Sequence, residues 1–96
     1  MLDKRNFYIN GKWVKPINPN DFEVINPSTE ETCAVISLGS KEDTDIAVDA
    51  AKGALVNWRE SSKDERIGLL EKLLSIYKNR YGEMADAISM EMGAPI

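Results

Sequence analysis

The sequence predicts an α/β fold in which two β-hairpins come first and about three α-helices follow. Two patterns support this order. Before residue 37, short runs of β-branched and aromatic residues flank turn-forming residues, as they do in hairpins. After residue 39, apolar residues recur at helical spacing behind two helix-start signals. Strands and helices are therefore expected in separate parts of the chain.

The first hairpin is expected over residues 7–14 and the second over residues 22–36. In the first, Asn10-Gly11 supplies the two positive-φ positions of a tight turn. In the second, Pro27 ends the first strand, because proline cannot donate to a β-ladder, and a polar stretch makes the turn.

The first two helices are expected at about 41–59 and 63–81. Ser40 gives the first a start that resembles a capping box, in which a serine side chain satisfies free N–H groups. The second has a full box from Ser62 to Glu65.

A third helix is expected at about 83–92, separated from the second by Gly82 and ended by Gly93. The apolar arc of Ile67–Tyr81 is wider than a surface helix needs. This helix is expected to be buried on more than one side, which requires more cover than the rest of the chain supplies.

Charge and composition exclude several classes of partner. The chain has 96 residues, 29% of them charged, a net charge of -4 and a pI of about 4.8. This length suits one small domain. An acidic surface disfavours nucleic acid, whose recognition needs a basic face. No apolar run is long enough to cross a bilayer, so no membrane partner is expected.

The numbers of cysteine and histidine residues limit which disulfides, catalytic groups and zinc sites these residues can form. One cysteine cannot form an internal disulfide, which favours a reducing, cytoplasmic setting. The absence of histidine excludes Ser-His and Cys-His catalysis within these residues, and leaves no His/Cys cluster for zinc.

Five motifs occur in a characteristic order. They are YINGKWV at 8–14, VINPSTEE at 24–31, SKEDTDIAVDAAKGA at 40–54, DERIGLLEKL at 64–73 and EMGAP at 91–95. Together they strongly resemble the N-terminal segment of the NAD(P)-dependent aldehyde dehydrogenase superfamily. The resemblance implies that residues 1–96 form the N-terminal part of a cofactor-binding α/β domain. Glu30 stands where the family commonly has glycine, and Ala94 where it commonly has lysine.

The family oxidises an aldehyde to a carboxylic acid through a cysteine thiohemiacetal, with NAD or NADP as hydride acceptor. The Gly-Gln-x-Cys, Glu-Leu-Gly-Gly and Gly-x-x-x-x-Gly contexts that carry this chemistry are absent from the 96 residues. No catalytic or cofactor-binding residue is therefore assigned, and the segment alone is expected to be inactive. The resemblance implies that the reading frame continues past Ile96, and that the whole enzyme is a homo-dimer or homo-tetramer.

Three groups of side chains could have a functional role, but a structural role is the preferred interpretation for each. Cys33 lies in a β run without a neighbouring histidine or helix N-terminus, and is expected to pack as a small hydrophobe. The aromatic residues Trp58, Tyr77 and Tyr81 are expected in a core or interface. A third group is expected to form a solvated, charged face with helix caps: Glu60, Asp64, Glu65 and Glu71.

The resemblance also implies a site for a monovalent cation, K+ or Na+, which some family members hold inside each subunit. By motif, its ligands correspond to the backbone carbonyls of Val24 and Ile25 and the carboxylate of Glu91. Hard oxygen ligands suit such an ion. The alternative is that Glu91 is a plain surface acid near a helix end.

A rival interpretation of the whole chain is a freestanding acidic interaction module. It would present the apolar face of Ile67–Tyr81 to a partner. The two interpretations differ in whether the coding frame runs on beyond this segment.

Overall fold

The computed structural model describes all 96 residues, which form five strands and three helices. The strands are β1 (Leu2–Lys4), β2 (Phe7–Ile9), β3 (Lys12–Val14), β4 (Asp21–Asn26) and β5 (Glu31–Ser37). The helices are α1 (Lys41–Trp58), α2 (Lys63–Asn79) and α3 (Tyr81–Met92). The predicted α/β fold, two hairpins followed by three helices, is confirmed.

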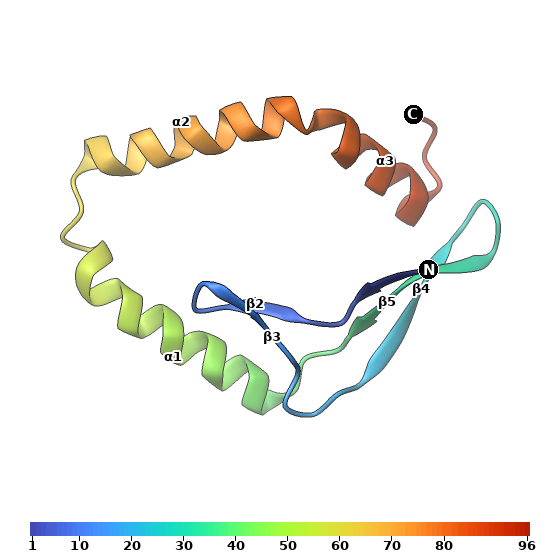
Figure 1. Cartoon of the computed structure of the whole chain (residues 1–96), viewed down its shortest axis with the longest axis horizontal. Helices are drawn as coiled ribbons and strands as arrows, with labels where there is room; N and C mark the ends of the chain where they lie inside the picture. Colours follow the sequence, from blue (N-terminus) through green and yellow to red (C-terminus); the bar gives the residue numbers. More distant parts are fainter.

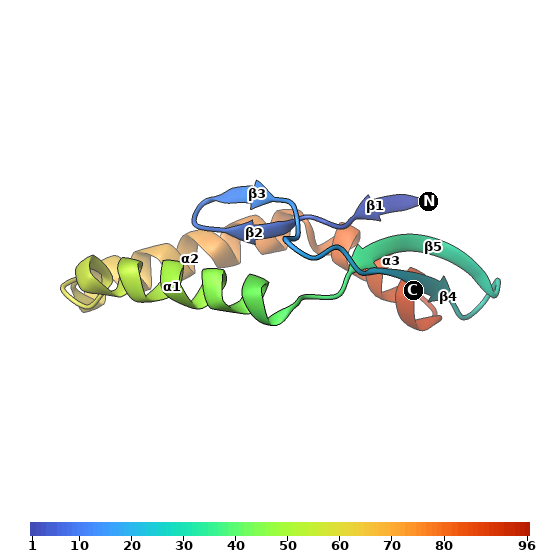
Figure 2. The same cartoon turned by 90° about the horizontal axis from the view of Figure 1, so that it is seen from below.

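The elements are arranged as a flat, open ring (Figure 1). The three helices form an arc, and the strands close it on the side where both termini lie. Seen edge-on, the ring is about one layer of secondary structure thick (Figure 2), with principal extents of 49 × 35 × 16 Å. Because a domain normally needs two packed layers around a core, this ring lacks its second layer.

The first hairpin, β2–β3, lies against α1 and projects into the ring (Figure 1). Its turn has φ values of 54° at Asn10 and 78° at Gly11, as the Asn-Gly signal predicts. Tyr8 and Trp13 face each other across the two strands with ring centroids 5.2 Å apart. Both side chains remain exposed.

The second hairpin, β4–β5, belongs to a sheet of three strands in the order β1-β5-β4. Strand β1 was not expected from the sequence, and it pairs in parallel with β5, with Leu2 opposite Ala34. A parallel pair of strands is not joined by a hairpin turn, so no turn residues in the sequence indicate it. A strand of three residues is also too short to show the alternation of apolar and polar side chains. The β4–β5 register shifts between Val24 and Ile25, so Cys33 is the extra residue of a β-bulge.

Both predicted capping boxes are present. The Ser40 hydroxyl accepts from the Asp43 N–H at 3.3 Å, and the Asp43 carboxylate accepts from the Ser40 N–H at 3.0 Å. Ser62 and Glu65 make the same reciprocal pair at the start of α2. These starts were predictable because each depends on residues three apart in the chain.

The break between α2 and α3 lies at Arg80, and not at Gly82 as the sequence predicts. Arg80 leaves helical geometry with φ -110° and ψ 15°, and its guanidinium forms an ion pair with Glu83 at 3.0 Å. Gly82 lies inside the first turn of α3. An interior glycine costs a helix only about 1 kcal/mol, so it need not end one.

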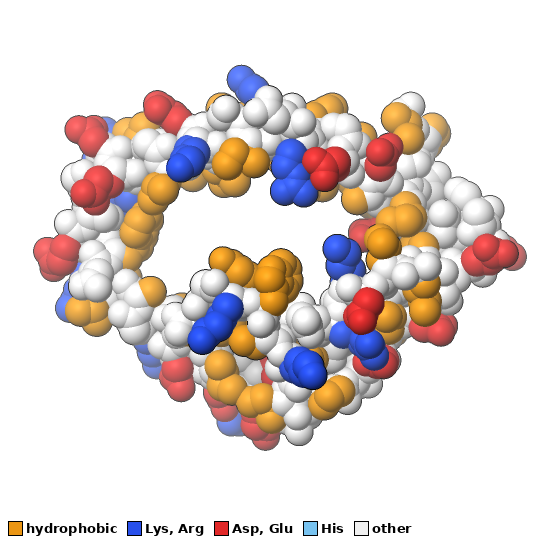
Figure 3. Space-filling view, in the orientation of Figure 1, with side chains coloured by type: hydrophobic (Ala, Val, Ile, Leu, Met, Phe, Trp, Pro, Cys, Tyr) orange, Lys and Arg blue, Asp and Glu red, His pale blue; other side chains and the backbone are white.

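The ring has almost no core of its own. Only Ala34, Ser37 and Asp43 are buried, and two of these are polar. Helix α2, expected to be buried on more than one side, has no buried residue. Hydrophobic side chains instead gather on the inner rim of α2 and on the hairpin inside the opening (Figure 3). The apolar face of α2 is present as predicted, but nothing in these residues covers it.

Polar contacts fix the loop 15–20 to the start of α1. The Ile17 N–H donates to the buried Asp43 carboxylate at 2.8 Å, and the Asn18 amide donates to Glu42 at 3.0 Å. At the far end of the loop, the Asn20 N–H donates to the Ser37 hydroxyl at 3.1 Å. The loop therefore joins the first hairpin, the sheet and α1 in one arrangement.

We predict that acid weakens this joint through Asp43. The Ile17 N–H, followed by the Ser40 N–H, holds the pKa of Asp43 below its ordinary value of 3.8. The carboxylate therefore stabilises the fold fully above the pKa of an unfolded aspartate, about 4, and this contribution is lost as pH falls through the lower folded pKa. The protection factor of the Ile17 amide, that is, its exchange relative to an unfolded amide at the same pH, should fall as a folded assembly of the chain is taken to acid pH.

Asp43→Asn should lower that protection factor at neutral pH and remove its dependence on acid, since an amide nitrogen cannot accept from both the Ile17 and the Ser40 N–H as the two carboxylate oxygens do. Asp45→Asn is the matched control, because Asp45 is exposed and pairs only with Lys41 across one helical turn. Equal effects of the two substitutions would contradict a specific role for Asp43.

Candidate functional site

A groove of about 740 Å³ lies between the three-stranded sheet and the helices α2 and α3. Its walls are mostly apolar and come from both sides: Leu2, Val24 and Ile36 from the strands, and Leu73, Ile76 and Met90 from the helices. Charged residues also line it, among them Lys4, Arg80 and Glu91. This groove is continuous apolar surface with polar groups on its margin, the anatomy of an interface.

Two of the three residues predicted to bind a cation line this groove. Val24 and Glu91 both line it, whereas Ile25 does not, and its side chain is exposed. The Val24 carbonyl accepts from the Cys33 thiol at 3.4 Å, which leaves its second lone pair free of side-chain partners. No group of three or more His, Cys, Asp or Glu side chains is placed to hold a metal ion.

The end of α3 approaches the β4–β5 turn closely. Gly93 caps α3 in the left-handed conformation with φ 74°. A Cβ at this position would lie 3.3 Å from Cβ of Pro27 and 3.4 Å from Oγ of Ser28. Glycine is therefore favoured at residue 93, both for its φ and because an added Cβ would force its neighbours to move. The same contact brings the Glu91 segment to the turn that follows Val24.

Glu30, in that turn, also has a positive φ, of 60°. The left-handed region favours glycine over other residues, which explains why the family pattern commonly has glycine here. The departure at Glu30 therefore costs conformational energy and touches no chemistry.

Cys33 has a structural setting. It is half-buried in the bulge of β5, and its thiol donates to the Val24 carbonyl. No charged side chain is among its hydrogen-bond partners. The prediction that it takes no part in catalysis agrees with this setting, which lacks the groups that generate a thiolate.

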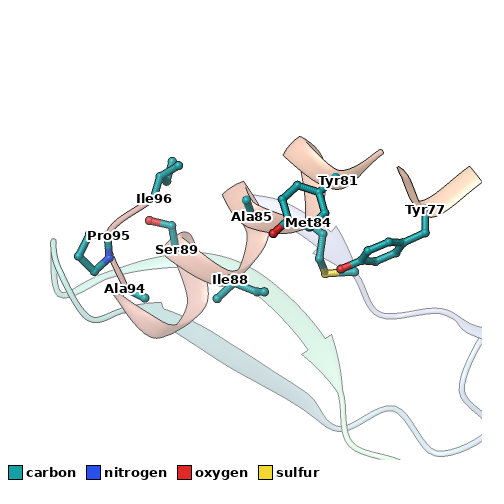
Figure 4. A pocket seen from close by; sticks show the side chains of 9 residues that line it. All are labelled: Tyr77, Tyr81, Met84, Ala85, Ile88, Ser89, Ala94, Pro95 and Ile96. Carbon is teal, nitrogen blue, oxygen red and sulfur yellow. The ribbon is translucent and has the colours of Figure 1, made fainter. Parts of the chain in front are cut away.

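The aromatic residues that could suggest a ligand cage do not form one. Tyr77 and Tyr81 pack edge to face, with centroids 6.0 Å apart. They line a hollow of about 210 Å³ together with residues of α3 and the C-terminal residues Ala94, Pro95 and Ile96 (Figure 4). Trp58 lies in a different hollow, at the α1–α2 turn, with Glu60 and Glu65 on its wall.

The strand-to-helix connection of this chain does not resemble a phosphate-binding turn. The one strand-to-helix connection, from β5 to α1, holds a single glycine, Gly39. The N-terminus of α1 is already satisfied by Ser40 and Asp43, and its first turn is acidic. A phosphate would meet negative charge instead of free N–H groups.

None of the three helices has the length and apolarity required to span a lipid bilayer.

The chain matches the aldehyde dehydrogenase family over residues 13–96. It is 47% identical, over its whole length, to a 3-succinoylsemialdehyde-pyridine dehydrogenase of a Pseudomonas species. Among solved structures, it is similar to an aldehyde dehydrogenase from Bartonella henselae, with 59% identity over 99% of the chain and a TM-score of 0.98. Aldehyde dehydrogenase C from Pseudomonas syringae, solved with NAD+ and octanal, gives 40% identity over 94% of the chain and a TM-score of 0.92.

The chain therefore belongs to the aldehyde dehydrogenase family. It spans about a fifth of the length of these relatives, 20% of the Pseudomonas enzyme and of the Bartonella structure and 19% of aldehyde dehydrogenase C. The matching part is the N-terminal one. These matches give no support to the rival interpretation as a freestanding interaction module.

We predict that Gly93→Ala destabilises any folded assembly of this chain by about 1–2 kcal/mol, from the left-handed φ, with a further loss from the short contact with Pro27. Gly82→Ala is the matched control. It lies within α3 with no atom near the added Cβ, so it should stabilise by roughly 0.5–1 kcal/mol. Thermal melting of the two variants checks this. A stabilising Gly93→Ala would show that the contact is absent.

Proposed function

We propose that this chain is the N-terminal segment of an NAD(P)+-dependent aldehyde dehydrogenase that oxidises an aldehyde to a carboxylic acid. The observation that carries the proposal is the match of almost the whole chain to the N-terminal part of a solved aldehyde dehydrogenase at a TM-score of 0.98. The nucleophilic cysteine, the base and the dinucleotide site would lie in the remaining four fifths. The chain's own role is then structural, and alone it is inactive.

The structural role follows from the ring. Its helices present an uncovered apolar face, and its sheet forms one wall of a groove. In the whole enzyme this surface would become part of the core of the cofactor-binding domain. A segment without catalytic groups then affects turnover by holding that domain in shape, since small misplacements of reacting groups slow catalysis strongly.

Three further features of the whole protein belong to the same proposal. The cofactor is NAD or NADP, since NAD+ is the nucleotide in the structure of aldehyde dehydrogenase C. The assembly is a homo-dimer or homo-tetramer, by family resemblance. The setting is the cytoplasm, because the one cysteine of this segment, Cys33, is free.

The proposal predicts that this chain can replace its counterpart in a relative. In the Bartonella henselae enzyme, the matching segment is exchanged for residues 1–96, and aldehyde-dependent reduction of NAD+ is measured with a panel of aldehydes. The chimera should keep kcat/KM within about 10-fold, equivalent to ~1.4 kcal/mol. A chimera that folds and binds NAD+ but shows no turnover would count against the proposed function.

Cys33→Ala is the internal control for this chimera. It should leave turnover nearly unchanged, because Cys33 donates only to a backbone carbonyl. A loss of ~100-fold or more, the scale of a missing catalytic group, would show that the active site has been misplaced.

We propose in addition that Val24 and Ile25, through their carbonyls, and Glu91 hold a monovalent cation in the whole enzyme. Val24 and Glu91 line one groove, and the C-terminal end of α3, which is the negative end of its dipole, is close to the same turn. The last turn of α3 has no basic side chain that could balance this negative end of the dipole. These features support a K+ or Na+ ion there.

For the chimera, this predicts a higher melting temperature in potassium chloride than in tetramethylammonium chloride. A ligand that binds only the folded state stabilises it by mass action, about 2.7 kcal/mol at 100 times its Kd. Glu91→Ala should abolish the difference, while Glu60→Ala, which removes an exposed carboxylate at the α1–α2 turn, should keep it. If Glu91→Ala responds to potassium as the parent does, Glu91 is not a ligand.

A further inference from the structure

The ring exposes far more surface than a protein of its size normally does. Its accessible area is 7923 Å² for 10.7 kDa. A compact monomer of this mass exposes about 5500 Å², so roughly 2400 Å² is in excess. The radius of gyration is 17.0 Å, against about 12–13 Å for a compact chain of this length. The excess is larger than the ~800 Å² that each partner buries in a standard interface.

The excess surface is apolar where it faces inward. On α2, Leu73 and Ile76 reach into the groove against the sheet, and both are exposed, at 61% and 47%. On the hairpin, Tyr8 and Trp13 are exposed at 63% and 70%. Exposed apolar area of this extent marks a surface that binds another polypeptide.

The joints that give the ring its shape are internal to the segment. Asp43 holds the loop that carries the first hairpin, and Gly93 brings α3 onto the β4–β5 turn. The docking surface is thus assembled by contacts among residues 1–96. It does not require a peptide bond to the polypeptide that covers it.

The occupant that fits is an aldehyde dehydrogenase chain without this segment. A second copy of the ring exposes the same uncovered apolar face and has no second layer of its own to offer. The Bartonella henselae enzyme has the same arrangement, at a TM-score of 0.98, within a chain about five times as long. The other four fifths of such a chain are the polypeptide against which this arrangement is found.

We propose that residues 1–96 bind in trans, without a covalent link, to an aldehyde dehydrogenase core that lacks its own N-terminal fifth, and that the two chains together form the folded enzyme. This inference rests on the proposed function. It adds that the inner surface around Leu73 and Ile76 alone suffices for association.

The test is co-expression of the 96-residue chain with an affinity-tagged Bartonella henselae enzyme truncated to lack the matching segment. The chain should co-purify at a 1:1 ratio, give one cooperative melt, and restore aldehyde-dependent NAD+ reduction. By itself, the chain should self-associate or lack a cooperative melt by light scattering and circular dichroism. A strictly monomeric, cooperatively folded chain that the core does not retain would overturn the proposal.

Neighbouring residues of α2 supply matched variants. Ile76→Glu places a charge in the groove and should weaken association at least about 100-fold. Ser75→Glu adds the same charge at a residue that does not line the groove and lies about 200° around the helix axis from Leu73. It should change the Kd by no more than about 3-fold. Equal loss in both variants would overturn the assignment of the surface.

The covalent chimera separates the two proposals. If the chimera is active and the separate chains never associate, docking in trans is wrong and the proposed function stands. If the separate chains associate and melt as one unit but neither they nor the chimera turn over, docking in trans is supported and the proposed function fails.

Discussion

The close approach of Gly93 to the β4–β5 turn determines the shape of the molecule. No packed core closes the ring, since the one buried apolar residue is Ala34. The end of the arc instead meets the β4–β5 turn at Gly93, where an added Cβ would lie 3.3 Å from Cβ of Pro27. On the other side of the opening, the buried carboxylate of Asp43 accepts from the Ile17 N–H and so holds the loop that carries the first hairpin. Two local joints thus define a surface that is otherwise unsupported.

The sequence predicted the features whose causes are local. The Asn10-Gly11 turn, the boxes at Ser40 and Ser62 and the stop at Gly93 each depend on a few adjacent residues, and each is found where expected. Hydrogen-bond donors and acceptors within one turn determine such features, so composition at fixed spacing reveals them.

The features that the sequence did not predict depend on contacts between residues far apart in the chain. Strand β1 exists only because Leu2 finds a partner at Ala34. The missing cover of α2 was predicted from its wide apolar arc, but the open ring that the elements form was not. The break at Arg80 depends on its geometry and its pair with Glu83, while the more conspicuous Gly82 is tolerated inside α3. The three residues predicted to bind a cation, Val24, Ile25 and Glu91, do not all line the groove. Strand alternation puts Val24 in the groove and turns the side chain of Ile25 away from it.

The energetics explain why a segment can be well defined in shape and still depend on another polypeptide. Burying one large aliphatic side chain contributes about 1.5–3 kcal/mol. Five such residues on α2 are largely exposed: Leu69, Leu70, Leu73, Leu74 and Ile76. Because these side chains are already about half covered, burying the rest would contribute roughly 4–8 kcal/mol, which is comparable to the whole stability of an ordinary domain. The stability of the ring therefore resides mainly in contacts that its own 96 residues do not make. The caps and turns select this one arrangement, and the polypeptide that covers α2 supplies the free energy that maintains it.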